Sequence, residues 1–237
     1  MTMKKIQLIL LTVFILTGCR KIVCIDGNHH TVRDERDAGV FNRVEADGSY
    51  DIIITYDSVP SLVVEAESNI NRLIATSRDG NTLKIQKARG HCIDIHRTVR
   101  VYIRQPHINS VDLDGSGNIS CNGFNEASFA LNLNGSGYIT ASVTAENLEA
   151  VISGSGDIYL SGIAGISKMR INGSGKIDGY NLKSKDGIAS IDGSGDIMIH
   201  ADSTLDASIS GSGNIYYTGK PIVSSRISGS GNISSNN

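Results

Sequence analysis

Ile152-Ser153-Gly154-Ser155-Gly156-Asp157-Ile158 is one of seven closely similar stretches in this chain of 237 residues. Each stretch contains Gly-Ser-Gly, and successive copies begin 20, 19, 19, 20, 18 and 18 residues apart. A nearly fixed period of this length is typical of a solenoid, in which each repeat forms one coil of a stack. The repeat therefore predicts the architecture before any other feature of the chain is considered.

The residues around each Gly-Ser-Gly alternate between apolar and polar. An aliphatic residue stands two positions before the first glycine and an isoleucine stands four positions after it, as Ile152 and Ile158 do around Gly154. Alternation with period two predicts extended strands with one buried face, which β-branched side chains suit. The seven isoleucines expected in the core are Ile119, Ile139, Ile158, Ile177, Ile197, Ile215 and Ile233.

These observations predict an all-β fold, a parallel and right-handed β-helix with coils of about 18–20 residues. A tight turn is expected at every Gly-Ser-Gly, because glycine either adopts a positive φ or leaves room where backbones approach closely. The sequence leaves both reasons open. A second corner is expected at Gly123, Gly162 and Gly219. The turn glycines are Gly115, Gly117, Gly135, Gly137, Gly154, Gly156, Gly173, Gly175, Gly193, Gly195, Gly211, Gly213, Gly229 and Gly231.

The beginning of the chain has the composition of an export signal. Two lysines precede an apolar run from Ile6 to Leu16, which is too short for a transmembrane span. Leu16-Thr17-Gly18-Cys19 then resembles a bacterial lipobox, in which the cysteine is acylated after cleavage. We expect residues 1–18 to be a signal peptide and Cys19 to be the lipid attachment site. The alternative is an ordinary signal peptide in which Cys19 is incidental.

Lipidation at Cys19 places the protein in the cell envelope as an outer-membrane lipoprotein, on either face of the membrane. Residues 19–37 are polar and charged, and we expect them to form a lipid-anchored tether. The formal net charge of −2 lacks the basic footprint that nucleic-acid binding requires, so no nucleic-acid partner is expected.

Residues 38–110 carry a weaker form of the same pattern. Asp47-Gly48-Ser49-Tyr50-Asp51-Ile52 matches Asp192–Ile197, with Tyr50 in place of the second glycine. Val44 takes the place of Ile191 only imperfectly, because it stands too early for an exact match. We expect residues 38–110 to form degenerate coils that cap the N-terminal end, and residues 111–237 to form the Gly-Ser-Gly β-helix.

The chain also resembles a known family, the head GIN domain group of auto-transporter adhesins. The resemblance rests on Phe41–Val44 with Gly48–Ile52, on Leu62–Ala66 leading to Asp79–Ile85, and on Val101–Ile103 running into Asp114–Gly117. It covers roughly residues 38–235. It implies a β-helical fold in an exported, often lipid-anchored protein, and it brings no catalytic residues.

The cysteines leave two arrangements open. Cys121 has the inward parity of its coil, which indicates a buried thiol that packs as a small hydrophobe. A disulfide between Cys92 and Cys121 is the alternative in an exported protein. Cys92, Asp94 and His96 share one strand face and are ligand types that zinc accepts, but they lack a fourth ligand.

A calcium ladder along the repeats is disfavoured by charge. The residue after the second glycine is acidic only at Asp157 and Asp196, and stacking would place Lys176 between them. Calcium requires six to eight oxygen ligands, which this row does not supply. We expect neither a metal nor a cofactor.

Three function classes remain. The first is a non-catalytic, adhesin-like binding protein for a glycan or protein ligand, with Tyr138, Tyr159 and Tyr216 facing the ligand. The second is a polysaccharide-processing enzyme using Asp51 with Asp57, or Asp94 with Arg97. The third is a structural envelope protein without a ligand.

The last coil raises a separate expectation. Little sequence follows the seventh repeat, and an unpaired parallel edge invites another strand. A homo-oligomer through the C-terminal coil is therefore one of the expected partners, besides the membrane.

Overall fold

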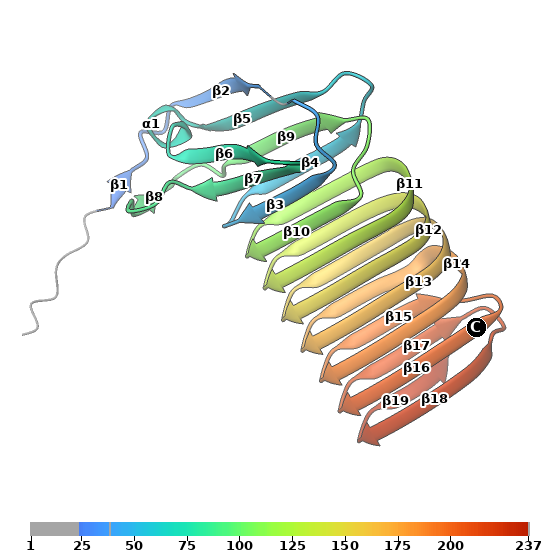
Figure 1. The fold of residues 1–237 in the computed structure, drawn as a ribbon. Coiled ribbons are helices and arrows are strands. Elements are labelled where there is room, and N and C mark those ends of the chain that lie inside the picture. Colours follow the sequence, from blue (N-terminus) through green and yellow to red (C-terminus); the bar gives the residue numbers. More distant parts are fainter. Residues whose placement is uncertain (1–23, 38, 237) are drawn as a thin grey trace, which may run out of the picture.

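The computed structural model describes residues 24–37 and 39–236. Parallel strands stack into a long β-helix that carries an irregular cap at its N-terminal end (Figure 1). The β-helix strands are β10 (Ser110–Gly115), β11 (Asn118–Gly135), β12 (Tyr138–Gly154), β13 (Asp157–Gly173), β14 (Lys176–Gly193), β15 (Asp196–His200), β16 (Thr204–Gly211), β17 (Asn214–Thr218), β18 (Ile222–Gly229) and β19 (Asn232–Ser235).

Successive coils lie in register. Gly115 pairs with Gly135 and Gly135 with Gly154, and the pairing continues through the last repeat. Every pairing from β10 onward is parallel, which confirms the predicted parallel β-helix. Each coil contributes to two sheet faces. Face A contains the residues that lead into Gly-Ser-Gly, and face B contains the residues that follow it.

Aliphatic columns from the two faces form the core. On face A the residue two positions before the first glycine stacks from Leu113 through Ile209, and all of these side chains are buried. On face B the isoleucine column stacks from Ile119 through Ile215, also buried. Burial of these columns removes apolar surface from water in every layer, which is the main stabilising term of the fold.

The two glycines of each turn are required for different reasons. The first has a positive φ, 137° at Gly154, and a Cβ there would overlap the Gly135 carbonyl of the layer before. The second has no positive φ, but a Cβ at Gly156 would lie 2.5 Å from the Gly137 carbonyl oxygen. Both of the reasons left open by the sequence therefore operate, and the serine between them points to solvent.

The cap contains β1 (Ile25–Asp26), β2 (Thr31–Arg36), β3 (Arg43–Asp47), β4 (Asp51–Tyr56), β5 (Ser61–Glu67), α1 (Ser68–Asn71), β6 (Ile74–Asp79), β7 (Thr82–Lys87), β8 (Ile93–Asp94) and β9 (Arg100–Gln105). β3 and β4 pair in parallel with β10 and β11 and continue both faces by one layer. β7 and β9 add a further parallel layer beyond them.

The outermost strands of the cap reverse direction. β6 pairs antiparallel with β7, β5 pairs antiparallel with β9, and β2 pairs antiparallel with β5. Beyond the two parallel layers, antiparallel strands therefore close the stack. The charged residues of β2 make this edge a poor template for another strand.

One alignment from the sequence changes in the structure. Ala46, not Val44, occupies the column of Leu113, and Val44 pairs with Val111 two positions earlier. Tyr50 does take the second-glycine position, where it is buried, and burial raises its pKa to about 12.

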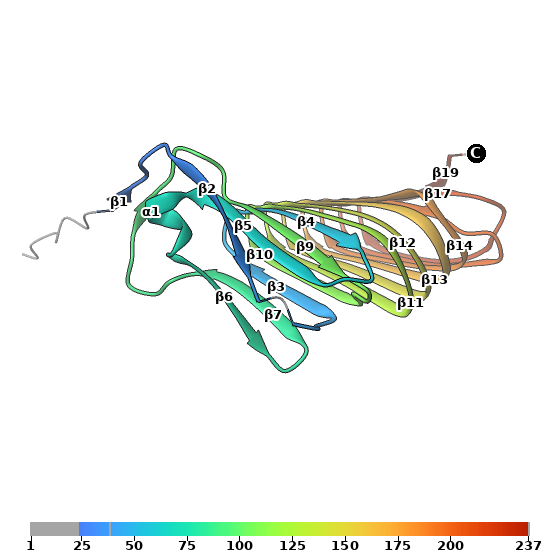
Figure 2. The same cartoon turned by 90° about the horizontal axis from the view of Figure 1, so that it is seen from above.

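The segment expected as a tether is folded from Cys24 onward. β1 pairs in parallel with β8, and Cys24 forms a disulfide with Cys92. The alternative pairing of Cys92 with Cys121 is therefore wrong, because β1 places Cys24 opposite Cys92 while Cys121 points into the core. Burial raises the pKa of the free Cys121 thiol. β1 and the C-terminal coil lie at opposite ends of the molecule (Figure 2).

A buried carboxylate organises the loops beside this disulfide. Glu67 is 1% exposed and accepts hydrogen bonds from the backbone N–H groups of His29 at 2.6 Å and His96 at 3.0 Å. A Cβ at Gly27 would overlap the Glu67 carboxylate, so this position requires glycine. The imidazole rings of His29 and His96, both exposed, stack with their centroids 4.2 Å apart.

Glu67 should make the stability of the cap depend on pH. Burial by itself raises the pKa of Glu67, but the backbone N–H donors outweigh it, and the net pKa lies below the ordinary value. The stabilisation is therefore complete above the unfolded-state pKa and is lost as the pH falls through the folded-state value. Glu67→Gln should lower the urea midpoint at pH 7, and the gap to wild type should narrow toward pH 3.

The control for this measurement is Glu45→Gln. Glu45 is exposed, and its carboxylate lies 3.9 Å from the Lys84 ammonium. Its loss should change the urea midpoint little at any pH. A gap between wild type and Glu67→Gln that stays constant from pH 7 to pH 3 would contradict the assigned role of the carboxylate.

The last coil differs from those before it. Ile227 is 44% exposed, whereas Ile209 in the same column of the preceding layer is 3% exposed. The difference arises because, among the described residues, no further strand stacks on β18 beyond its pairing with β16. Ile222 is 80% exposed and continues the outward-facing row of Thr204. Within the described residues, no antiparallel strand covers this end as β2, β5 and β6 cover the other.

Candidate functional site

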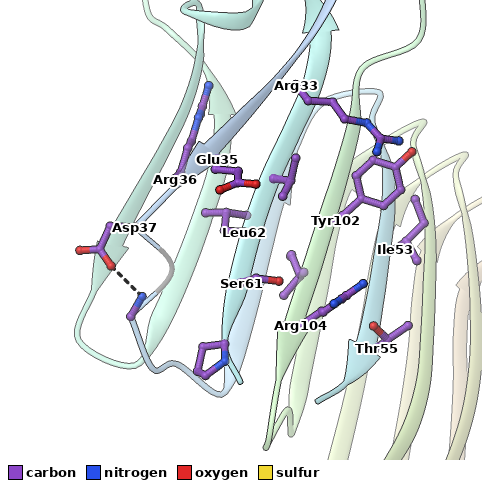
Figure 3. A pocket seen from close by; sticks show the side chains of 14 residues that line it. Arg33, Glu35, Arg36, Asp37, Ile53, Thr55, Ser61, Leu62, Tyr102 and Arg104 are labelled. Carbon is purple, nitrogen blue, oxygen red and sulfur yellow. Dashed lines mark hydrogen bonds between the residues drawn. The ribbon is translucent and has the colours of Figure 1, made fainter. Parts of the chain in front are cut away.

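A cleft of about 840 Å³ lies on the outer surface of the cap, over face B. Its floor and walls come from β2, β5, β9 and β4, which are neighbours in the sheet (Figure 3). This volume is in the range of small-ligand sites. Its lining residues are Arg33, Glu35, Arg36, Asp37, Gly39, Ile53, Thr55, Pro60, Ser61, Leu62, Val63, Tyr102, Ile103 and Arg104.

Strand alternation decides which side chains reach the cleft. In β9, Val101 and Ile103 are buried in the core, so Tyr102 and Arg104 point outward. The register then aligns Val63, Tyr102 and Ile53 in one row across three strands. This row forms an apolar strip along the floor of the cleft.

One wall of the cleft is an ion-pair ladder. The Arg33 Nε donates to Glu65 at 2.6 Å, and Arg100 donates to the other Glu65 oxygen at 3.1 Å. The hydrogen bond from Arg33 is the main reason that the pKa of Glu65 lies below its ordinary value. The Arg33 guanidinium also lies over the Tyr102 ring, 5.3 Å from its centroid. These groups are already satisfied by one another.

The other wall has polar groups without strong partners. Arg104 is 62% exposed, and its guanidinium approaches Asp57 only to 3.7 Å. Ser61 and Thr55 flank Arg104 in the register, and among the described residues their side chains have no hydrogen-bond partner. The Glu35 carboxylate also has none, and it lies beside Val63 at the β2 end of the apolar strip. A ligand that offers donors and acceptors to this wall would gain hydrogen bonds without breaking existing ones.

Arg36 contributes to the cleft as a structural residue. Its guanidinium donates to the carbonyl oxygens of Asn71 and Ile74 at 2.9 and 2.7 Å, and to Thr76 Oγ1 at 3.0 Å. Asn71 in turn donates to the Val64 carbonyl at 3.0 Å. Arg36 therefore ties β2 to α1 and β6 and is not available to a ligand.

The predicted ligand-facing tyrosines lie outside the cleft but on the same face. The row of Tyr102 and Ile53 continues through Ser120 and Thr140 to Tyr159, and then through Asp178 and Met198 to Tyr216. Tyr138 is half-exposed in the adjacent row. Sequence reasoning missed Tyr102, because the antiparallel pairing that brings β5 beside β9 has no repeat signal.

The structure shows where the two groups of residues considered for metal binding lie. Cys92 is consumed by the disulfide and cannot serve as a thiolate ligand beside Asp94 and His96. The register does place Lys176 between Asp157 and Asp196, as predicted, with its ammonium 4.8 Å from the Tyr159 ring centroid. Within residues 24–37 and 39–236, no three His, Cys, Asp or Glu side chains gather as a metal site.

The carboxylates considered for catalysis are not brought together. Asp51 begins β4 and Asp57 follows its end, so the two are separated by roughly 20 Å of extended strand. Glycosidic acid–base pairs lie about 5 to 10 Å apart. Asp51 accepts a hydrogen bond from Asn118 at 2.7 Å, and Asp57 accepts one from the Val59 N–H at 3.0 Å. Asp94 lies on β8, which pairs with β1 alone among the described strands.

A family model described as "Putative auto-transporter adhesin, head GIN domain" matches residues 40–221. This chain belongs to the head GIN domain family. The match includes β4, β5 and β9 of the cleft and most of the β-helix, but not β2, and it confirms the resemblance seen in the sequence. No protein among the curated sequences matches the chain.

Solved structures confirm the head GIN fold. A putative adhesin from Bacteroides fragilis NCTC 9343 superposes with a TM-score of 0.85 at 25% identity, covering 90% of this chain and 100% of that one. A putative lipid binding protein from Parabacteroides distasonis ATCC 8503 superposes with a TM-score of 0.75 at 23% identity, covering 91% of this chain and 100% of that one. A putative adhesin from Parabacteroides merdae ATCC 43184 superposes with a TM-score of 0.71 at 21% identity, covering 90% of this chain and 99% of that one.

The adhesin description of the head GIN family implies an extracellular or envelope location. Within the part of the chain that the structure describes, no helix has the length and hydropathy needed to cross a membrane.

Proposed function

We propose that this head GIN protein is a lipid-anchored, non-catalytic binding protein of the bacterial outer membrane. Cys19 carries the lipid, residues 1–18 are the removed signal peptide, and the cap cleft on face B is the main ligand site. The observation that carries the binding role is the wall of unpartnered polar groups beside an apolar floor, on the outer surface of a rigid sheet. The ligand is a glycan or a protein.

The folded start at Cys24 shortens the tether between lipid and body. Only five residue steps separate Cys19 from the disulfide, which corresponds to at most about 17 Å of chain. The cap therefore stays close to the membrane surface, while the C-terminal coil lies at the far end of the stack. Tyr138, Tyr159 and Tyr216 would offer further contacts to a ligand that extends from the cleft along face B.

We also propose the C-terminal coil as the contact for a second copy. Its exposed Ile222 and Ile227, together with the outer edge of β18, favour strand pairing across such a contact. The opposite end is closed by antiparallel strands, so a two-fold contact between C-terminal coils is favoured over a head-to-tail fibre. Sedimentation equilibrium that finds only monomer at high concentration would exclude this contact.

The binding role is tested with the mature protein on glycan and protein arrays. Wild type should bind at least one array member, and Tyr102→Ala combined with Arg104→Ala should weaken that binding at least tenfold. Arg170→Ala removes an exposed arginine from face A and should leave the binding to that array member unchanged. In cells, Cys19→Ala should release the protein from the membrane fraction. Absence of binding to any glycan or protein would favour a purely structural envelope role.

A further inference from the structure

We infer that the cap cleft recognises a saccharide that carries a carboxylate, such as a uronate-containing glycan. The inference rests on the proposed binding function and specifies the ligand class of the same site. Three features of the cleft carry it: the apolar strip on its floor with the Glu35 carboxylate at one end, the free hydroxyl groups on its wall, and the weakly paired guanidinium of Arg104.

The floor suits the C–H face of a sugar ring. Val63, Tyr102 and Ile53 form a short strip on three neighbouring strands, and Figure 3 shows Tyr102 beside Ile53. Polar side chains border the strip on both sides. A pyranose ring has this mixed character, with apolar C–H groups on its faces and hydroxyl groups around its edge. An acyl chain would instead need an enclosed apolar cavity, whereas this cleft opens to solvent over a sheet surface.

The wall suits hydroxyl groups better than a peptide backbone. The floor of the cleft is the middle of a sheet, where the backbone N–H and C=O groups are already paired in the ladders of β5, β9 and β4. A peptide strand would therefore find no edge to extend within the cleft. Glu35, Thr55 and Ser61 can each accept a hydrogen bond, and the two hydroxyl groups can also donate.

Arg104 provides the preference for a negative charge. Its planar guanidinium matches a carboxylate with two parallel hydrogen bonds, and this geometry is specific to arginine. Asp57 is too far away at 3.7 Å to satisfy it, and Arg33, the other exposed arginine of the cleft, is held by Glu65. Arg104 is thus the cation of the cleft that is best placed to pair with a ligand carboxylate.

The inference is tested by calorimetric titration with uronate oligosaccharides, each paired with its carboxyl-reduced form. Glucuronate, galacturonate and mannuronate oligomers serve as the probes. Wild type should bind at least one acidic oligomer at least tenfold more tightly than its reduced counterpart. Arg104→Ala should remove that difference, and Arg104→Lys should restore only part of it. Tyr102→Ala should weaken acidic and reduced forms equally.

The outcomes separate this inference from the proposed function. Equal affinity for acidic and reduced forms would overturn the role of the carboxylate while leaving a glycan-binding protein. Binding of protein ligands but of no saccharide would overturn the saccharide assignment and leave the binding role intact. If Arg104→Ala still bound the acidic oligomer more tightly than its reduced form, the role assigned to Arg104 would also be overturned. Circular dichroism of each variant, compared with Arg170→Ala, ensures that a loss of affinity does not reflect loss of the fold.

Discussion

Replacing Gly154 by alanine should destabilise the β-helix by about 3 to 5 kcal/mol. Two costs combine at this position. The φ of 137° is one that side-chain-bearing residues rarely adopt, and the added Cβ would overlap the Gly135 carbonyl of the layer before. The carbonyl cannot move away easily, because it accepts hydrogen bonds from the backbone N–H groups of Ser155 at 2.9 Å and Gly156 at 3.0 Å. Urea unfolding followed by circular dichroism measures the loss.

The neighbouring serine gives the matched control. Ser155 lies between the two glycines, its side chain points to solvent, and only its backbone N–H takes part in the turn. Ser155→Ala should therefore change the free energy of unfolding by about 0.5 kcal/mol or less. Similar urea midpoints for Gly154→Ala and Ser155→Ala would show that the turn tolerates a side chain, against the structure.

Shortening Ile171 to alanine should cost about 2 to 5 kcal/mol, the range for deletion of a fully buried isoleucine side chain. Ile171 is 0% exposed and lies in the face A column between Ile152 and Ile191. The cavity would open in the middle of the stack, where neighbouring layers on both sides resist collapse. The same urea measurement applies, with unfolding also followed by hydrogen exchange because stacked repeats can open separately.

Ile227 is the control in the same column. It occupies the equivalent position in the last coil but is 44% exposed, since no layer covers it. Ile227→Ala should cost about 1 kcal/mol or less in the monomer. Equal losses at Ile171 and Ile227 would mean that the last coil is buried in solution, as the proposed contact between two copies requires. The two variants are therefore compared both at low and at high protein concentration.

The repeat region was predictable because its information is local and repeated. Each coil has the same alternation, and the columns follow from simple addition of one period, so the burial of Ile171 and the turn at Gly154 required no knowledge of distant contacts. Cys121 was expected to be buried for the same reason, and it is. Even the stacking of Lys176 between two aspartates followed from the period alone.

The cap was less predictable because its pairings join residues far apart in the chain. β2 pairs with β5, and Cys24 forms a disulfide with Cys92, 68 residues away. Neither pairing follows from the repeat period. The polar sequence of β2 looked like a tether, since an edge strand over a small cap needs few buried side chains. The sequence also did not predict the cleft, because the antiparallel pairings bring β2 and β5 beside β9.

By itself, then, the sequence determined the coil, its glycine turns and its isoleucine columns, since these depend on neighbours one period away. Tertiary structure decided how the cap closes the stack, which cysteines pair, and where Tyr102 and Arg104 meet. Antiparallel closure depends on the relative free energies of several long-range pairings, and no single stretch of the chain encodes that comparison.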